Sequence, residues 1–212
     1  MFPVSDVIPS RRRPIVTVGL IAANALVFLY ELQLDAASMH ELARTYGLIP
    51  AEFAWSRLPT STFLHDGWIH FGGNMLYLWI FGDNVEDALG HLGYLAFYAA
   101  AGAAGALAHT FVHPDSSAPL IGASGGVAAV MGAYFVLYPR SQVLTAVFLV
   151  LYLDIIEVPA IFFLGMWLLL QVFSGVASIG AGDAGVAFAT HVVGFGIGAS
   201  VGFMLKGRGR WD

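Results

Sequence analysis

Six long apolar runs constrain this 212-residue chain more than any other feature. They cover about residues 14–32, 68–88, 92–112, 123–138, 158–176 and 188–206. A helix needs about 20 apolar residues to cross the ~30 Å hydrocarbon core of a bilayer, and only the fourth run is clearly short. Charged residues make up 11% of the chain, against roughly a quarter in soluble domains. We therefore expect an all-α integral membrane protein, with residues 1–212 forming one domain.

The composition excludes several classes of site. The chain has no cysteine, so it has no disulfide framework, thiolate metal site or cysteine nucleophile. Its net charge is −5 and its one basic cluster is residues 11–13, which argues against a nucleic-acid partner. We expect no cofactor and no bound metal, with the lipid bilayer as the surrounding medium. The oligomeric state is left open.

The positions of the basic residues predict the orientation, because Lys and Arg gather on the cytoplasmic side. Six spans leave only Arg44 and Arg57 on the outer side. The other seven lie on the opposite side: Arg11, Arg12, Arg13, Arg140, Lys206, Arg208 and Arg210. Both termini are therefore expected to be cytoplasmic. The short termini, without accessory domains, favour a bacterial inner membrane.

Three segments need separate interpretation. Residues 143–153 are apolar but too short to cross, so we expect an interfacial or packed connector there. The loop at 33–67 is expected to form amphipathic elements at the outer interface. Residues 11–13 and the following apolar run also resemble a signal peptide with a weak site at 23–25. The run continues to Leu32, which favours an uncleaved anchor.

Four polar residues fall at a similar depth near the outer ends of three spans. They are His70 and Asn74 in the second span, Ser124 at the start of the fourth and His191 in the first turn of the sixth. Polar side chains within spans are costly and usually face the bundle interior or a cavity. A serine nucleophile needs a base within hydrogen-bonding reach, and His191 is the best-placed candidate.

The same residues can build an oxyanion hole. His70 and Asn74 are four residues apart, so they share one face of a helix. The first backbone N–H groups of the fourth helix have no intrahelical partner. Side-chain donors from one helix and backbone donors from another can therefore converge on one point.

Glycines provide the means of contact between the fourth and sixth helices. Gly194, Gly198 and Gly202 recur every fourth residue after His191, and Gly125 and Gly132 narrow the fourth helix. Small residues at such spacing let helix backbones approach closely in membranes. Close approach would bring Ser124 and His191 together.

Five short motifs point to a known family. They are Gly122-Ala123-Ser124-Gly125, His70-x-x-x-Asn74, His191-x-x-Gly194-x-x-x-Gly198, Trp55-x-Arg57 and Gly82-x-x-Val85-Glu86-x-x-x-Gly90. On these residues the chain resembles the rhomboid intramembrane serine proteases over nearly its whole length. Trp55-x-Arg57 carries one residue more than the family's Trp-Arg motif. Each motif alone is weak, but their occurrence together within six spans is a strong signal.

The resemblance implies a six-helix rhomboid-like bundle that hydrolyses peptide bonds in or near transmembrane segments of other proteins. Ser124 would be the nucleophile and His191 the general base, without an acidic third member. His70, Asn74 and the Ser124 backbone N–H would line the oxyanion hole, supported by glycines at 122, 125, 194 and 198.

One position departs from some relatives. They carry an aromatic residue four positions after the serine, packed against the catalytic imidazole, where this chain has Ala128. The orientation of the imidazole must come from elsewhere, and Phe195 and Tyr134 are candidates.

Other functions fit the sequence less well. A catalytically inactive rhomboid-like protein that binds client helices is the main alternative, and the intact set of polar residues speaks against it. A transporter would be expected to place polar groups near the midplane of the membrane, whereas here they cluster near one face. His65 lacks the acidic partners of a metal site. The order Ser124, Asp183, His191 also fits an α/β-hydrolase elbow, but that fold needs a strand before the serine.

Overall fold

The computed structural model describes residues 2–149, 152–178 and 188–207. Asp183 of the rejected hydrolase triad, and Arg208 and Arg210 of the predicted cytoplasmic cluster, lie outside the described residues.

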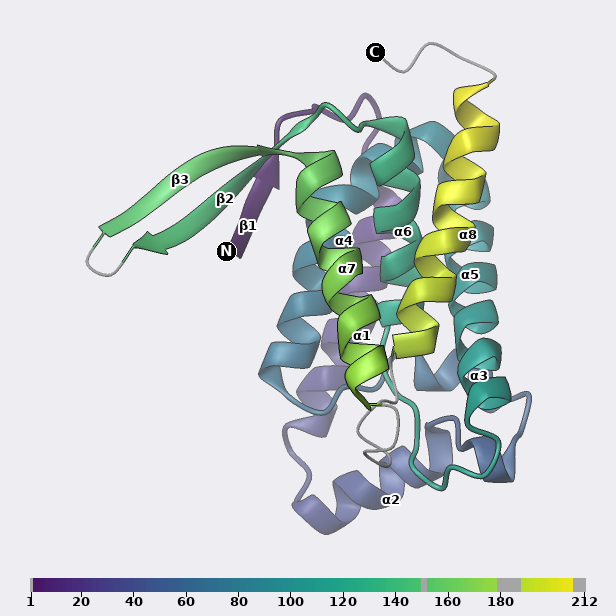
Figure 1. The fold of residues 1–212 in the computed structure, drawn as a ribbon. Coiled ribbons are helices and arrows are strands. Elements are labelled where there is room, and N and C mark those ends of the chain that lie inside the picture. The colour runs from purple at the N-terminus through teal and green to yellow at the C-terminus, as the bar shows by residue number, and fades with distance from the viewer. Residues whose placement is uncertain (1, 150–151, 179–187, 208–212) are drawn as a thin grey trace.

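Six long helices form a bundle (Figure 1). They are α1 (Ile15–Glu31), α4 (Trp68–Leu89), α5 (His91–Val112), α6 (Ser124–Leu137), α7 (Ala160–Ser178) and α8 (Phe188–Lys206). Each helix begins and ends within two residues of the corresponding apolar run. The agreement arises because each helix is a predominantly apolar stretch flanked by polar, Gly or Pro residues.

The short helix α6 forms the core of the bundle. All but two of its 14 residues are buried, and α4, α5, α7 and α8 pack around it. A helix that is apolar on every face is expected to be buried on every face. The position of Ser124 at its first residue is therefore fixed by surrounding helices.

Helices α6 and α8 make the closest contact in the bundle, as the glycine spacing predicts. A Cβ added at Gly194 or Gly198 would collide with the carbonyl oxygens of Gly125 and Ala129, respectively. A Cβ at Gly202 would lie 3.0 Å from the carbonyl oxygen of Ala133. Larger residues on this stripe would push the two backbones apart.

The segment between α1 and α4 packs on the bundle through short elements. They are α2 (Ala36–Tyr46), the 3₁₀ turn η1 (Pro50–Glu52) and α3 (Arg57–Ser61). Asp35 caps α2 by accepting a 2.8 Å hydrogen bond from the Ser38 amide. Leu48 is fully buried and pairs with Leu120 through two backbone hydrogen bonds. This loop therefore has a fixed arrangement.

The expectation of an all-helical chain is wrong in one region, because the chain contains a small antiparallel sheet. Strands β1 (Phe2–Asp6), β2 (Gln142–Leu149) and β3 (Tyr152–Pro159) pair in the order β1-β2-β3. The β2–β3 hairpin projects sideways from the bundle (Figure 1). The segment 143–153 was expected as a connector, and its described residues, 143–149 and 152–153, belong to strands β2 and β3. Their Val, Leu, Thr and Phe content favours a strand, and the predicted span from 158 begins only at Ala160.

A hydrogen-bonded cluster holds the bundle end that lies near β1. The Glu86 carboxylate accepts bonds from the amides of Val16 and Thr17 at 2.9 and 2.8 Å. It therefore caps the N-terminus of α1, where free N–H groups and the helix dipole favour an anion. Gly82 lets α4 approach α1, because a Cβ there would lie 2.8 Å from the Thr17 methyl group. Gly90 links α4 to α5 with φ +71, a conformation that favours glycine.

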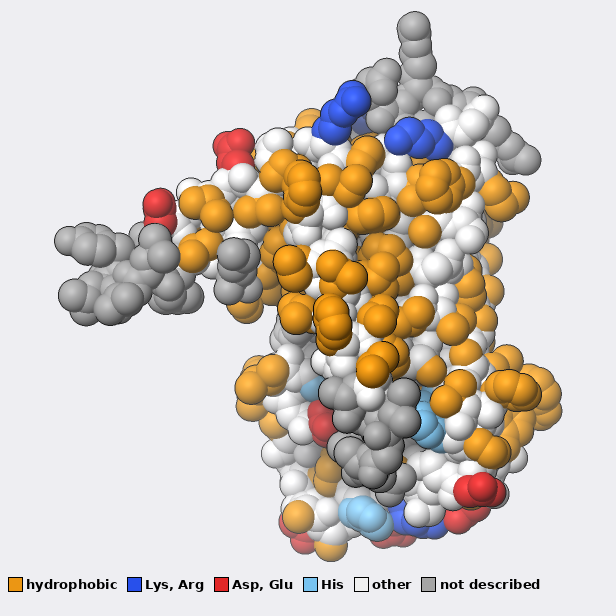
Figure 2. All heavy atoms as spheres, in the orientation of Figure 1, with side chains coloured by type: hydrophobic (Ala, Val, Ile, Leu, Met, Phe, Trp, Pro, Cys, Tyr) orange, Lys and Arg blue, Asp and Glu red, His pale blue; other side chains and the backbone are white. Residues whose placement is uncertain are grey.

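The outer surface of the bundle is strongly apolar. Hydrophobic side chains form a band over its middle, and charged side chains gather at the two ends and on the hairpin (Figure 2). By length and composition, α5 and α8 could each cross a membrane, whereas α1, α6 and residues 160–176 of α7 are shorter apolar helices.

Candidate active site

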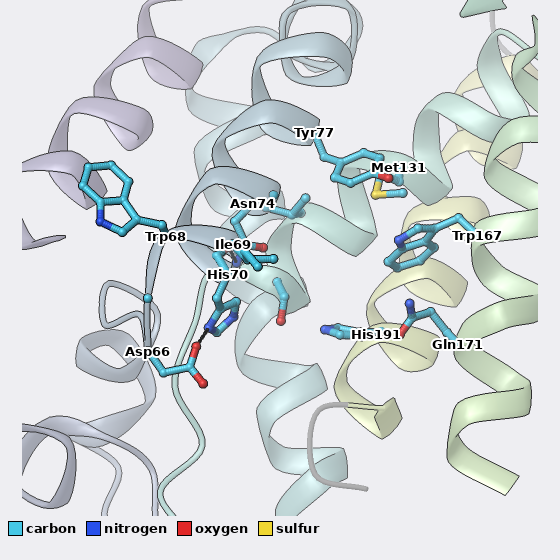
Figure 3. Close-up of a pocket in the computed structure, with 14 residues that line it drawn as sticks. Asp66, Trp68, Ile69, His70, Asn74, Tyr77, Met131, Trp167, Gln171 and His191 are labelled. Atoms are coloured by element: carbon cyan, nitrogen blue, oxygen red, sulfur yellow. Dashed lines mark hydrogen bonds and ion pairs between the residues drawn. The ribbon is translucent and has the colours of Figure 1, made fainter. Parts of the chain in front are cut away.

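A cavity of about 940 Å³ (Figure 3) is lined by residues near the starts of α4, α6 and α8, which lie toward the bundle end away from the sheet (Figure 1). Four helices line it: α4, α6, α7 and α8. The residues singled out from the sequence meet here, since His70, Asn74, Ser124 and His191 all line the cavity. They come from three helices that are far apart in the sequence.

Ser124 is held by an unusual backbone before it. Gly122 has φ +117, and a Cβ at this position would lie 2.6 Å from Nε2 of His70. The Gly122 amide donates a 2.9 Å bond to the Ser61 carbonyl. No side chain caps the start of α6, so its first N–H groups are free to face a ligand. Apart from the bridge at Leu120, the described segment before Ser124 forms no strand, so the hydrolase elbow is absent.

His191 points into the cavity from the first turn of α8 (Figure 3). Its Nδ1 lies 2.7 Å from Oε1 of Gln171 on α7. Its Nε2 is buried and has no hydrogen-bond partner among the described residues. The ring of Trp167 packs against the imidazole, with centroids 5.9 Å apart. One face and one nitrogen of the ring are thus held by α7, and the other nitrogen is free.

Ala128 lies where an aromatic ring would not fit. It is fully buried, and its Cβ would be 3.3 Å from a Cβ added at Gly194. The ring that contacts His191 comes from Trp167 instead. Phe195 stacks on Trp167 at 6.2 Å, and Tyr134 hydrogen-bonds to Asp6 near the other end of the bundle. Neither of the two expected candidates replaces the missing ring directly.

His70 and Asn74 face the cavity from α4. Nδ1 of His70 lies 2.7 Å from Oδ1 of Asp66. When Nδ1–H donates to Asp66, Nε2 can donate only if the ring is protonated. One N–H of Asn74 donates a 3.0 Å bond to the His70 carbonyl. An amide has a second N–H, which leaves Asn74 with a donor for the cavity.

His65 supports this wall of the cavity. It is 1% exposed, and its ring packs 5.0 Å from that of His70. Its backbone amide donates to the Glu31 carboxylate at 3.1 Å. Burial and the neighbouring His70 lower the pKa of His65 to about 4. In the described part of the chain, no three His, Cys, Asp or Glu residues are grouped so as to hold a metal ion.

The sequence interpretation missed three residues at this site: Asp66, Trp167 and Gln171. Gln171 had a detectable signal, because it is the most polar residue within the apolar run at 158–176, and polar residues in spans tend to be functional. Asp66 had one too, since it precedes His70 by one helical turn.

The comparison with protein families settles the kinship of the chain. The rhomboid domain model matches residues 52–208, about three quarters of the chain. The chain belongs to the rhomboid family. This family is membrane-embedded, and its members are usually serine proteases. The match includes every residue that lines the cavity.

Two curated relatives are distant. The chain is 35% identical over 74 residues to Rhomboid-like protein 11, chloroplastic, of Arabidopsis thaliana, covering 35% of this chain and 26% of the relative. It is 27% identical over 138 residues to Rhomboid protein 1, mitochondrial, of Saccharomyces cerevisiae, covering 61% and 38%. The chain thus matches well under half the length of each. Both names place the relatives in organelles, so they lend no support to a bacterial membrane.

Proposed function

We propose that this rhomboid is an intramembrane serine endopeptidase that cleaves transmembrane proteins in or near their membrane-spanning segments. The observation that carries the proposal is the shared cavity: Ser124 and a histidine with a free ring nitrogen line one opening in an apolar bundle.

In the proposed mechanism, Ser124 attacks the scissile carbonyl while Nε2 of His191 accepts the hydroxyl proton. His191 then gives this proton to the leaving amine, which breaks the peptide bond and leaves an acyl-enzyme. Water entering the cavity attacks the ester, and His191 again takes and returns a proton. The product acid is released and Ser124 regains its hydrogen.

The oxyanion of each tetrahedral intermediate would lie among donors from α4 and α6. The free N–H of Asn74 and the Ser124 backbone N–H can donate whatever the protonation state of His70. Nε2 of His70, held next to Gly122, can add a third donor when the ring is protonated. One such donor contributes about 2.7–4 kcal/mol to transition-state stabilisation.

The cavity also provides a route for an apolar substrate. Helices α4 and α7 form opposite walls of it (Figure 3). Between them, the ring of Tyr77 on α4 lies 6.4 and 6.5 Å from the rings of Phe163 and Trp167 on α7. Trp68 and Ile69 at the start of α4 are largely exposed. An extended segment of a substrate helix could therefore enter between α4 and α7 and reach Ser124.

We further propose six membrane spans, α1 and α4 to α8, with both termini cytoplasmic. Arg11, Arg140 and Lys206 lie at the bundle end near the sheet, in agreement with the positive-inside rule. The cavity would then open toward the opposite side of the membrane.

The test is cleavage of a model transmembrane substrate in detergent by the wild type and by the Ser124→Ala and His191→Ala variants. We expect both variants to lose cleavage and to unfold at the wild-type temperature. A serine-directed fluorophosphonate should label the wild type and not Ser124→Ala. Cleavage by Ser124→Ala would refute the assignment, and a wild type that neither cleaves nor becomes labelled would favour an inactive protein that binds client helices.

A further inference from the structure

Helix α7 carries no charged residue and yet reaches His191 with a polar side chain. Between Ala160 and Ser178, Gln171 lines the cavity, and its Oε1 is 2.7 Å from Nδ1 of His191. The bond joins two residues that are 20 positions apart in the sequence and lie on different helices. Burying an amide in an apolar bundle is costly unless it finds a partner, and this partner is the ring of the proposed base.

We propose that Gln171 is a positioning residue that fixes the tautomer and the orientation of His191. This inference rests on the proposed protease function and extends it to a neutral third member of the Ser124–His191 pair.

The chemistry follows from the two ring nitrogens. A neutral imidazole carries one proton, so a ring that donates from Nδ1 has an unprotonated Nε2. Oε1 of Gln171 can only accept, and it therefore selects the tautomer with the proton on Nδ1. Nε2, buried and without a partner in the described part of the chain, is then left as the base at the cavity. The opposite tautomer would place a proton on Nε2 and prevent it from accepting one from Ser124.

Trp167 completes the arrangement one helical turn before Gln171. Its ring lies 5.9 Å from the imidazole, and the ring of Phe195 on α8 stacks on the indole at 6.2 Å. The imidazole of His191 therefore cannot rotate freely about χ2. Trp167 of α7 takes the role of the aromatic residue that some relatives carry at the position of Ala128. Both restraints on the base thus come from α7.

A neutral partner differs from a carboxylate in its effect on protonation. A carboxylate next to the ring would favour the imidazolium, whereas an amide orients the ring without adding charge. The titratable groups on the helices packed against α8 are His91, Tyr94, Tyr98 and His109 of α5 and Tyr134 of α6. His70 of α4, which is paired with Asp66, lines the same cavity. None of these touches Nδ1 of His191, so a change at position 171 should act on this histidine directly.

The test compares Gln171→Leu with Gln171→Glu. Gln171→Leu keeps the approximate size but cannot accept a hydrogen bond, and we expect kcat to fall roughly 100-fold with KM little changed. Gln171→Glu can still accept, so it should keep most of the activity. Its charge should move the acidic limb of the kcat/KM profile to higher pH by one unit or more. Ser174→Ala, an exposed neighbour on the same helix, is the matched control and should behave as wild type.

A second measurement does not depend on activity. ¹⁵N NMR of histidine-labelled Ser124→Ala protein should show His191 with its proton on Nδ1, and adding Gln171→Leu should give a mixture of tautomers. Wild-type kcat in Gln171→Leu, or an unchanged tautomer in that double variant, would overturn the positioning role. A wild type that does not cleave, with the Nδ1–H tautomer still lost on Gln171→Leu, would overturn the protease function and leave the positioning role standing.

Discussion

The two ends of the bundle each bury polar side chains, but they use them differently. At the sheet end, both carboxylate oxygens of Glu86 accept hydrogen bonds, from Val16, Thr17 and His91. At the cavity end, Nε2 of His191 has no partner among the described residues, and Asn74 keeps a spare donor.

The difference separates polar residues that stabilise the fold from those available for chemistry. A buried polar group left without a partner costs about 1–3 kcal/mol. Oδ1 of Asn84 and both ring nitrogens of His109 also lack a partner among the described residues, so the missing partner of His191 points to function because this residue lines the cavity. The satisfied cluster joins α1, α4 and α5 at one end. The polar groups of His191 and Asn74, which keep a free acceptor and a free donor, line the cavity at the other end of helix α4.

Glu86→Ala removes the hydrogen-bond acceptor at the sheet end of the bundle, and we expect it to have the largest effect. It leaves the first amides of α1 without an acceptor, and we expect a loss of about 3–5 kcal/mol of unfolding free energy. Unfolding in detergent micelles measures this, with the exposed Glu41→Ala as control. Cleavage per folded molecule should remain near wild type, and a selective loss of activity would contradict the structural role.

Asn74→Ala tests the other end of α4. Removal of one oxyanion donor should lower kcat by roughly 100-fold or more with little change in KM. Asn84→Ala on the same helix is the matched control, because Asn84 donates to the Ile8 carbonyl at the sheet end. That control should lower the unfolding temperature and leave kcat nearly unchanged. Equal effects of both variants on kcat would remove Asn74 from the site.

The smallest effect concerns acid stability of the cavity wall. His65 has a folded pKa of about 4 against an ordinary 6.5, so the unfolded chain binds a proton that the folded chain resists. His65 therefore costs no stability above pH 6.5 and destabilises the fold progressively as the pH falls from 6.5 to 4, by at most about 3 kcal/mol. Unfolding temperatures of wild type and His65→Gln over this range should diverge in slope. Parallel curves would mean that the pKa of His65 does not differ between the folded and unfolded states.

Much of the fold was accessible from the sequence because length and apolarity determine the helices. The start of α6 at Ser124 and of α8 at Phe188 matched the predicted runs to within a residue. The hairpin was not predicted, since the short apolar run at 143–153 fits a strand or a helix equally well. Its pairing with β1 at the start of the chain depends on tertiary structure.

The candidate site was only partly predictable. His70, Asn74, Ser124 and His191 could be placed at one depth because charge distribution and span direction order them along the membrane normal. The contact of Gln171 with His191 could not be derived this way. It depends on the rotation of α7 about its own axis, which is set by packing of Trp167 and Phe195.

The length of α6 has a consequence for how the proposed reaction is supplied. Its 14 residues measure about 21 Å at 1.5 Å per residue, roughly 9 Å less than a ~30 Å hydrocarbon core. In the proposed orientation, the C-terminal end of α6 would lie level with the cytoplasmic boundary, and the helix would stop short of the outer boundary, with Ser124 below the outer membrane surface. Water would have to reach Ser124 from the outer face, and a substrate would have to present a few unwound residues at that depth. Membrane thickness would therefore influence which substrates are cleaved.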